Sequence, residues 1–194
     1  AATLAESRRG WAGLAGALEL DLSTTPLAVS GLIDGVKVVA RAERSAASEH
    51  RLVIAATFDE PLGLGLTVQP RRRHRGRREP ESERRRGRRS FSRLFDEQAR
   101  RTRTRFRRAF DIRAAEVWEA DQLLDQSLQE ALLSLKKEFP AMELSDAELR
   151  VTHPTVPSSR SALEHLLRSV TVVARLVDLR ARGLHPDPAS GPYR

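Results

Sequence analysis

A run of arginines in the middle of the chain most constrains how the chain can fold. Residues 71–93 contain twelve arginines, three glutamates and no lysine. Within this run, residues 71–90 contain no apolar residue but include two glycines and a proline. Such a segment cannot bury enough surface to offset the entropy lost on ordering, and its like charges repel one another. We therefore predict that residues 71–90 form a disordered insert within a folded domain.

The basic charge is confined to this part of the chain. The formal net charge is +8, yet residues 71–113 alone hold nineteen arginines and six acidic residues. This stretch therefore carries +13 and the remaining residues carry −5. The distribution indicates a mildly acidic globular protein with a basic insert, and not a protein that is basic throughout.

Length and composition restrict the class of protein further. A chain of 194 residues is typical of one domain. Cysteine is absent, which excludes disulfides and thiolate chemistry and fits a cytoplasmic location. No run of about 18 apolar residues occurs, so we predict no membrane span. The chain begins with Ala1 instead of Met, which is compatible with a processed or trimmed N-terminus.

The residues before the insert predict a β-meander. A short helix at 1–18, weakened by three glycines, precedes strands expected at 27–33, 36–41, 50–58 and 62–69. The first two strands flank Asp34-Gly35, a pair suited to a type I′ turn because both positions require positive φ. In the last strand, leucine and valine alternate with small or polar residues, which indicates one buried face.

The residues after the insert predict a helix-rich half. In order, we expect a basic amphipathic helix at 92–108, a strand at 110–117, a helix at 121–138 capped by Asp121, a hairpin at 142–152 and a helix from 158–161 to Gly183. The alternative for the strand is one continuous helix from 92 to 139. Ser161 and Glu164 have the spacing of a capping box. The tail, 184–194, is predicted to be disordered.

This order of elements predicts an α+β fold. We expect an antiparallel β-meander sheet with two or three helices packed on one face, interrupted by the disordered arginine-rich insert. Residues 1–70 and 91–183 are then two halves of a single domain, and 71–90 and 184–194 lie outside its core.

Motifs for catalysis are not found. No GxSxG nucleophile motif and no glycine-rich phosphate loop is present, and the histidines do not have metal-ligand spacing. The acidic pairs Asp59/Glu60 and Asp146/Glu148 lie in expected turns, where we interpret them as solvated acids. We therefore predict no enzymatic activity, no cofactor and no metal.

The arginine-rich insert is the candidate binding site. Each arginine can neutralise a phosphate and release a counterion. The predicted polyanion-binding residues are Arg71, Arg72, Arg73, Arg75, Arg77, Arg78, Arg84, Arg85, Arg86, Arg88 and Arg89. Our first hypothesis is a binding module that contacts the phosphates of RNA or DNA, or another polyanion, with little sequence specificity.

Four phenylalanines follow the insert, and two interpretations of them are open. Phe91, Phe95, Phe106 and Phe110 recur at helical spacing. They can stack on exposed bases, or they can pack into the core of the domain.

Two other functions remain as alternatives. In one, the domain is a structural or protein-interaction domain, and the insert is an incidental solvated loop. In the other, residues 91–110 lie on an anionic membrane surface with phenylalanines inward and arginines at the headgroups. The sequence alone does not predict an oligomeric state.

Overall fold

The computed structural model describes residues 4–44, 50–71 and 91–184, and side chains only from 7–44, 50–71 and 99–184. Apart from Arg71 and Leu184, the predicted disorder of 71–90 and of the tail falls outside the described residues. The helices are α1 (Leu4–Leu18), α2 (Phe91–Ala109), α3 (Val117–Leu123), α4 (Gln126–Glu138) and α5 (Arg160–Leu184). The strands are β1 (Asp21–Thr24), β2 (Leu27–Ile33), β3 (Val36–Arg44), β4 (His50–Thr57), β5 (Thr67–Pro70), β6 (Phe110–Arg113), β7 (Ala141–Ser145) and β8 (Glu148–His153).

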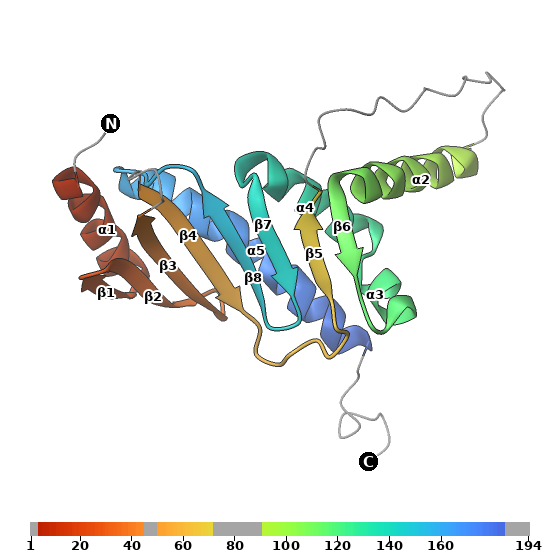
Figure 1. Ribbon diagram of the computed structural model, residues 1–194, viewed down its shortest axis with the longest axis horizontal. Coiled ribbons are helices and arrows are strands. Elements are labelled where there is room, and N and C mark those ends of the chain that lie inside the picture. The colour runs from red at the N-terminus through yellow and green to blue at the C-terminus, as the bar shows by residue number, and fades with distance from the viewer. Residues whose placement is uncertain (1–3, 45–49, 72–90, 185–194) are drawn as a thin grey trace, which may run out of the picture.

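The strands form one antiparallel sheet in the order β1-β2-β3-β4-β8-β7-β5-β6 (Figure 1). The sheet is continuous across the insert, because β4 from the first half pairs with β8 from the second half. Consecutive strands β1 to β4 make a meander. The α+β fold with an antiparallel sheet is therefore confirmed.

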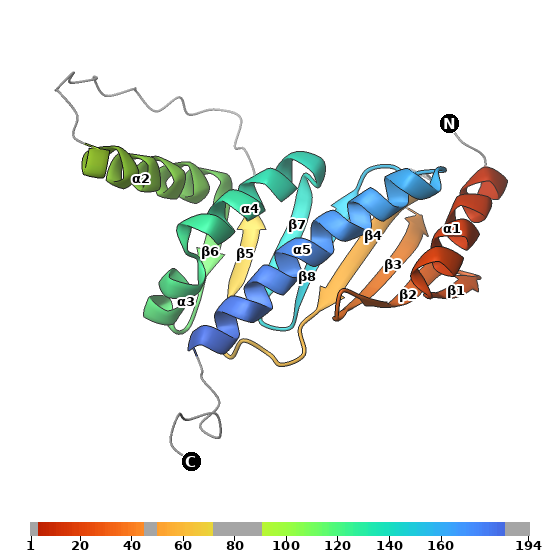
Figure 2. The same cartoon turned by 180° about the vertical axis from the view of Figure 1, so that it is seen from behind.

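The helices cover one face of this sheet. Figure 2 shows α5 crossing the back of the sheet diagonally, with α1 at one end and α4 and α3 at the other. The apolar stripe of α5 is buried against the strands, including Leu163, Leu167, Val170 and Val177. Five helices are described where four were expected along the chain, because the helix predicted at 121–138 is divided into α3 and α4. The face seen in Figure 1 carries no described helix.

The expected β2–β3 hairpin is confirmed, including its turn. Asp34 has φ 51° and Gly35 has φ 83°, as a type I′ turn requires. Ile33 and Val36 pair directly on either side of it. The short strand β1 was not predicted, because all four of its residues are exposed and it lacks an apolar pattern.

The predicted strand at 62–69 is wrong over most of its length. Only Thr67–Pro70 is a strand, since Gly63 and Gly65 adopt φ values of 71° and 60° that interrupt the extended backbone. The three leucines that alternate with these glycines, Leu62, Leu64 and Leu66, are nevertheless buried. The strand also does not continue the meander, because the β7–β8 hairpin lies between β4 and β5 in the sheet.

The end of one strand and the starts of two helices also differ from expectation. The strand predicted at 110–117 ends at Arg113, and the alternative of one continuous helix is wrong. The helix predicted at 121–138 is divided into α3 and α4, and its cap is Asp125, whose carboxylate accepts a hydrogen bond from the Leu128 N–H. At the start of α5, Ser159 accepts a hydrogen bond from the Ala162 N–H, so the predicted Ser161 capping box is wrong.

Candidate polyanion-binding surface

The basic helix α2 is anchored by one apolar side. Phe106 is buried and its ring lies 4.7 Å from that of Phe110, the first residue of β6. Lys136 of α4 lies over the Phe110 ring and donates to the carbonyl oxygen of Ala109 at the end of α2. Thr102 donates a hydrogen bond to Glu130 of α4. These contacts fix the rotation of α2 about its axis and thereby determine where its arginines point.

The burial of these rings decides between the two interpretations of the phenylalanines. Phe106 and Phe110 are both 1% exposed, so packing in the core is confirmed for them and base stacking is wrong. The side chains of Phe91 and Phe95 lie outside the described residues. The ring faces that base stacking would use are therefore not available at positions 106 and 110.

One side of α2 is neutralised by α3. Arg103 approaches the carboxylate of Asp121 to 2.6 Å, and Arg107 approaches the same carboxylate to 3.8 Å. Both arginines are about half exposed, so solvent screens these ion pairs. The pairs orient the two guanidinium groups towards α3 and remove them from the set of free cations.

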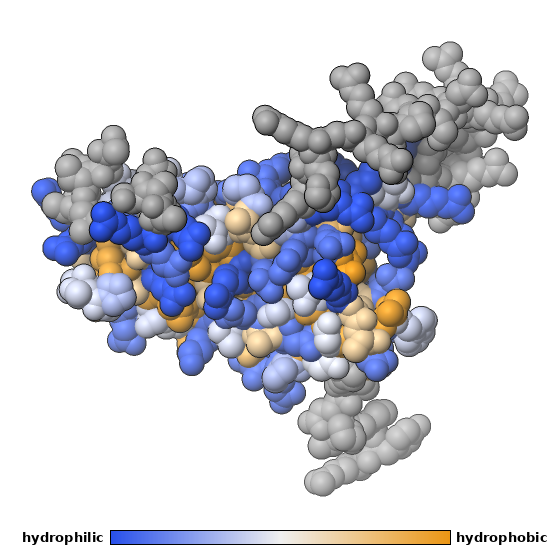
Figure 3. All heavy atoms as spheres, in the orientation of Figure 1, coloured by the Kyte–Doolittle hydropathy of each residue, from blue (hydrophilic) through white to orange (hydrophobic). Residues whose placement is uncertain are grey.

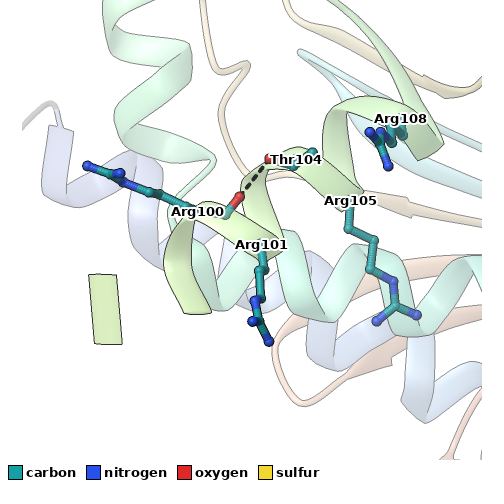
Figure 4. A pocket seen from close by; sticks show the side chains of 5 residues that line it. All are labelled: Arg100, Arg101, Thr104, Arg105 and Arg108. Carbon is teal, nitrogen blue, oxygen red and sulfur yellow. Dashed lines mark hydrogen bonds between the residues drawn. The ribbon is translucent and has the colours of Figure 1, made fainter. Parts of the chain in front are cut away.

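The outward side of α2 carries arginines without acidic partners. Arg100, Arg105 and Arg108 are exposed and form no ion pair within the described part of the chain. Together with Arg101 and Thr104 they line a shallow hollow of about 410 Å³, and Figure 4 shows their guanidinium groups directed away from the helix axis. The Thr104 hydroxyl donates to the Arg100 carbonyl oxygen, 2.8 Å away. This outward face is suited to binding several negatively charged groups at once.

The arginine-rich insert of residues 71–90 begins next to α2. The Arg71 N–H donates to the carbonyl oxygen of Ala109, 2.9 Å away, so the chain leaves β5 beside the C-terminal end of α2. It rejoins the described structure at Phe91, the first residue of α2. The nineteen residues between these points thus begin beside the C-terminal end of α2 and end at its N-terminus. The other predicted binding residues lie outside the described residues: Arg72, Arg73, Arg75, Arg77, Arg78, Arg84, Arg85, Arg86, Arg88 and Arg89.

An apolar surface that we did not predict lies beside α2. Val117 and Trp118, at the start of α3, are 68% and 73% exposed. A hollow of about 280 Å³ between α2, β6 and α3 is lined by Arg107 and Val117 among others. Figure 3 shows apolar surface over β6 and α3 next to the hydrophilic surface of α2. The sign of this apolar surface in the sequence is the pair Val117-Trp118, which does not fit the leucine stripe of the following helix.

The acidic pairs have structural partners. Asp59 pairs with Arg182 of α5, and Glu148 pairs with Arg150. Asp146 accepts hydrogen bonds from the backbone N–H groups of Gly65 and Leu66. Of these four acids, Asp146 thus holds a backbone segment in place, and Asp59 and Glu148 form surface ion pairs.

Two of the described histidines have partners in the structure. His165 contacts Glu138 at 3.1 Å on the surface between α4 and α5, and His153 lies 2.7 Å from the Thr155 carbonyl oxygen. No group of three or more potential metal ligands is found among the residues with a described position. Within the same residues, no helix combines the length and apolar character needed to cross a membrane.

Comparison with known proteins identifies the fold alone. No protein-family model matches the chain, and no curated protein matches its sequence. The chain is similar to the crystal structure of the mycobacterial trehalose monomycolate transport factor A, TtfA, with a TM-score of 0.52 and 15% sequence identity. The similarity covers 93% of this chain and 97% of that chain. The two chains therefore share an architecture over nearly their whole lengths.

Proposed function

We propose that the protein is a non-enzymatic binding domain for polyanions, with the outward face of α2 and the adjoining arginine-rich tract as its binding surface. The observation that carries the proposal is the division of α2 into two sides. Arg103 and Arg107 are neutralised by Asp121, whereas Arg100, Arg105 and Arg108 are exposed and have no acidic partner in the part of the chain with described positions. Binding through phosphates or similar groups requires little sequence specificity.

The charge of the surface supports this proposal. The nineteen residues of α2 include seven arginines and two acids. The segment between Arg71 and Phe91 adds ten more arginines; it begins beside the C-terminal end of α2 and ends at the first residue of the same helix. A helix fixes the backbone positions of its arginines, so less backbone entropy is lost on binding than for an unstructured peptide.

A salt titration tests the proposal. Fluorescence anisotropy of a labelled single-stranded oligonucleotide, a simple soluble polyanion, is measured with the intact chain and with the triple variant Arg100→Gln, Arg105→Gln, Arg108→Gln. Loss of three phosphate contacts reduces the slope of log K against log salt by about 2. Replacing residues 72–90 by a Gly-Ser segment of equal length measures the contribution of the tract in the same assay.

A matched variant controls for net charge. Arg8, Arg9 and Arg44 are exposed arginines on α1 and β3, at the opposite end of the sheet from α2 (Figure 1). Changing these three to glutamine removes the same charge and is expected to leave the slope nearly unchanged. Equal slopes for both triple variants, or no measurable binding by the intact chain at physiological salt, contradict the proposal.

The alternative is a structural or protein-interaction domain in which the tract is a solvated loop. The chain with the same architecture, TtfA, is a trehalose monomycolate transport factor, and its name refers to no polyanion, which agrees with this alternative. It predicts attraction to polyanions that disappears at physiological salt, and a protein partner that binds equally well when residues 72–90 are replaced.

A further inference from the structure

The two most exposed of the large apolar side chains that the structure describes are adjacent in the sequence. Trp118 and Val117 have the highest exposed fractions among these side chains, 73% and 68%. They occupy the first turn of α3, whose buried residues are Ala120 and Leu123. An exposed indole beside an exposed aliphatic side chain has a large apolar area and one polar N–H. This combination suits the boundary between lipid headgroups and acyl chains.

This apolar pair lies next to the cationic helix. Val117 and Arg107 line the same hollow of about 280 Å³, and Asp121, one turn after Val117, contacts both Arg103 and Arg107. Figure 1 places α2 and α3 at the same end of the molecule, beyond the edge strand β6. Exposed apolar side chains therefore lie beside a helix whose other side carries free arginines, and proteins that bind anionic membrane surfaces combine these two kinds of group.

From this geometry we infer that the polyanion is an anionic lipid bilayer, with the arginines of α2 at the headgroups and Val117 and Trp118 inserted below them. The inference rests on the proposed function and names its ligand. A single-stranded nucleic acid fits less well, because Phe106 and Phe110 are buried and Trp118 is the one exposed ring among the side chains of this surface that the structure describes. Val117 gives an aliphatic contact that a base does not need and that an acyl layer accommodates.

The two tryptophans of the chain allow a direct test with the intact protein. Trp118 is exposed and Trp11 is fully buried, so only the emission of Trp118 responds to a bound bilayer. Vesicles of phosphatidylcholine are compared with vesicles containing an equal amount of phosphatidylglycerol, with and without brominated acyl chains. We expect a blue shift and bromine quenching with the anionic vesicles alone. In Trp118→Ser, which retains Trp11, neither signal appears.

Co-sedimentation with vesicles measures the affinity of each protein variant for the anionic bilayer. The double variant Val117→Ser, Trp118→Ser is expected to bind anionic vesicles roughly tenfold more weakly because apolar contact is lost. Each of Arg100→Gln, Arg105→Gln and Arg108→Gln weakens vesicle binding by about fivefold at low salt. Leu32→Ser is the matched control, since Leu32 is 66% exposed on β2 at the other end of the sheet, and it leaves vesicle binding unchanged.

The outcomes separate this inference from the proposed function. Unchanged vesicle binding by the double variant, without bromine quenching, overturns the inference and leaves polyanion binding in place. Quenching of Trp118 by an oligonucleotide, with no response to anionic vesicles, shows that the ligand is a nucleic acid and overturns the inference alone. Failure to bind vesicles and oligonucleotides alike contradicts both proposals.

Discussion

Asp146 holds Leu66 in place through a hydrogen bond of 2.7 Å from the Leu66 backbone N–H to the Asp146 Oδ1. The second carboxylate oxygen accepts from the Gly65 N–H at 2.8 Å. This one side chain, in the turn between β7 and β8, thus fixes the irregular segment that leads into β5. It replaces the strand pairing that the positive φ values of Gly63 and Gly65 prevent.

Removing this carboxylate is therefore expected to destabilise the domain. Asp146→Ala leaves two backbone N–H groups without their charged acceptor and lowers the free energy of unfolding by about 2 kcal/mol. Asp146→Asn, which retains one acceptor oxygen, has a smaller effect. Urea denaturation measures both variants. Asp59→Ala, which removes an exposed acid paired with Arg182, is the control and changes stability by less than about 1 kcal/mol. Equal losses of unfolding free energy in Asp146→Ala and Asp59→Ala would show that the hydrogen bonds of Asp146 stabilise the domain no more than an exposed ion pair does.

The glycines of α1 are expected to differ sharply in their tolerance of alanine. A Cβ at Gly10 would lie 2.1 Å from the carbonyl oxygen of Ser158, so α1 approaches the backbone before α5 closely at this point. Gly10→Ala must displace one of these segments and is expected to cost about 2 kcal/mol. A Cβ at Gly16 meets nothing within 4 Å, and Gly16→Ala is expected to stabilise the helix by about 0.5–1 kcal/mol. Thermal unfolding of the two variants measures the difference, and a stabilising Gly10→Ala would contradict the close approach.

Features set by neighbours in the chain were predictable from the sequence, and features set by distant residues were not. The Asp34-Gly35 turn and the apolar stripe of α5 follow from local rules of backbone geometry and periodicity. The pairing of β4 with β8 joins residues about one hundred positions apart, and no local pattern specifies it. The same holds for Gly10, whose role depends on Ser158. From the sequence, the glycines of α1 are predicted only to weaken the helix.

The candidate polyanion-binding surface likewise depends partly on local sequence and partly on residues far apart in the chain. The clustering of arginines predicted a basic site and a basic amphipathic helix, and that helix is present as α2. Which arginines are free depends on α3, because Asp121 neutralises Arg103 and Arg107. Asp121 was instead predicted to cap a helix, since the break between α3 and α4 at Asp125 was not recognised. The exposure of Trp118 likewise became apparent only from packing.

The ion pairs of Glu43 predict a small dependence of stability on pH. Burial alone would raise the pKa of Glu43, but the hydrogen bond from Arg51 and the charge of Arg41 more than offset this and hold the pKa below its ordinary value of 4.5. Because the folded pKa is below the unfolded one, the stabilisation is fully present above pH 4.5 and is lost as the pH falls through the folded pKa. Glu43→Gln should lower the free energy of unfolding at neutral pH by less than about 1 kcal/mol.

Urea denaturation at several pH values checks this prediction. The difference between Glu43→Gln and the unchanged chain should shrink as the solution is made more acidic. In an Arg51→Gln background the effect of Glu43→Gln should be smaller, because the hydrogen bond of 3.0 Å between these residues is already lost. A difference that stays constant from neutral to acidic pH would rule out the ionised carboxylate as its source.

Neutralising Asp121 is expected to strengthen polyanion binding. Asp121→Asn leaves Arg103 and Arg107 without the carboxylate that they contact at 2.6 and 3.8 Å, so two more arginines of α2 become available to a polyanion. Affinity for a labelled oligonucleotide or an anionic vesicle should rise about threefold at low salt, and the salt dependence should become steeper. Asp34→Asn is the control, because it makes the same charge change in the β2–β3 turn, where asparagine tolerates the φ of 51°. If Asp34→Asn strengthens binding as much as Asp121→Asn does, net charge alone controls affinity, and the division of α2 into a neutralised side and a free side has no functional consequence.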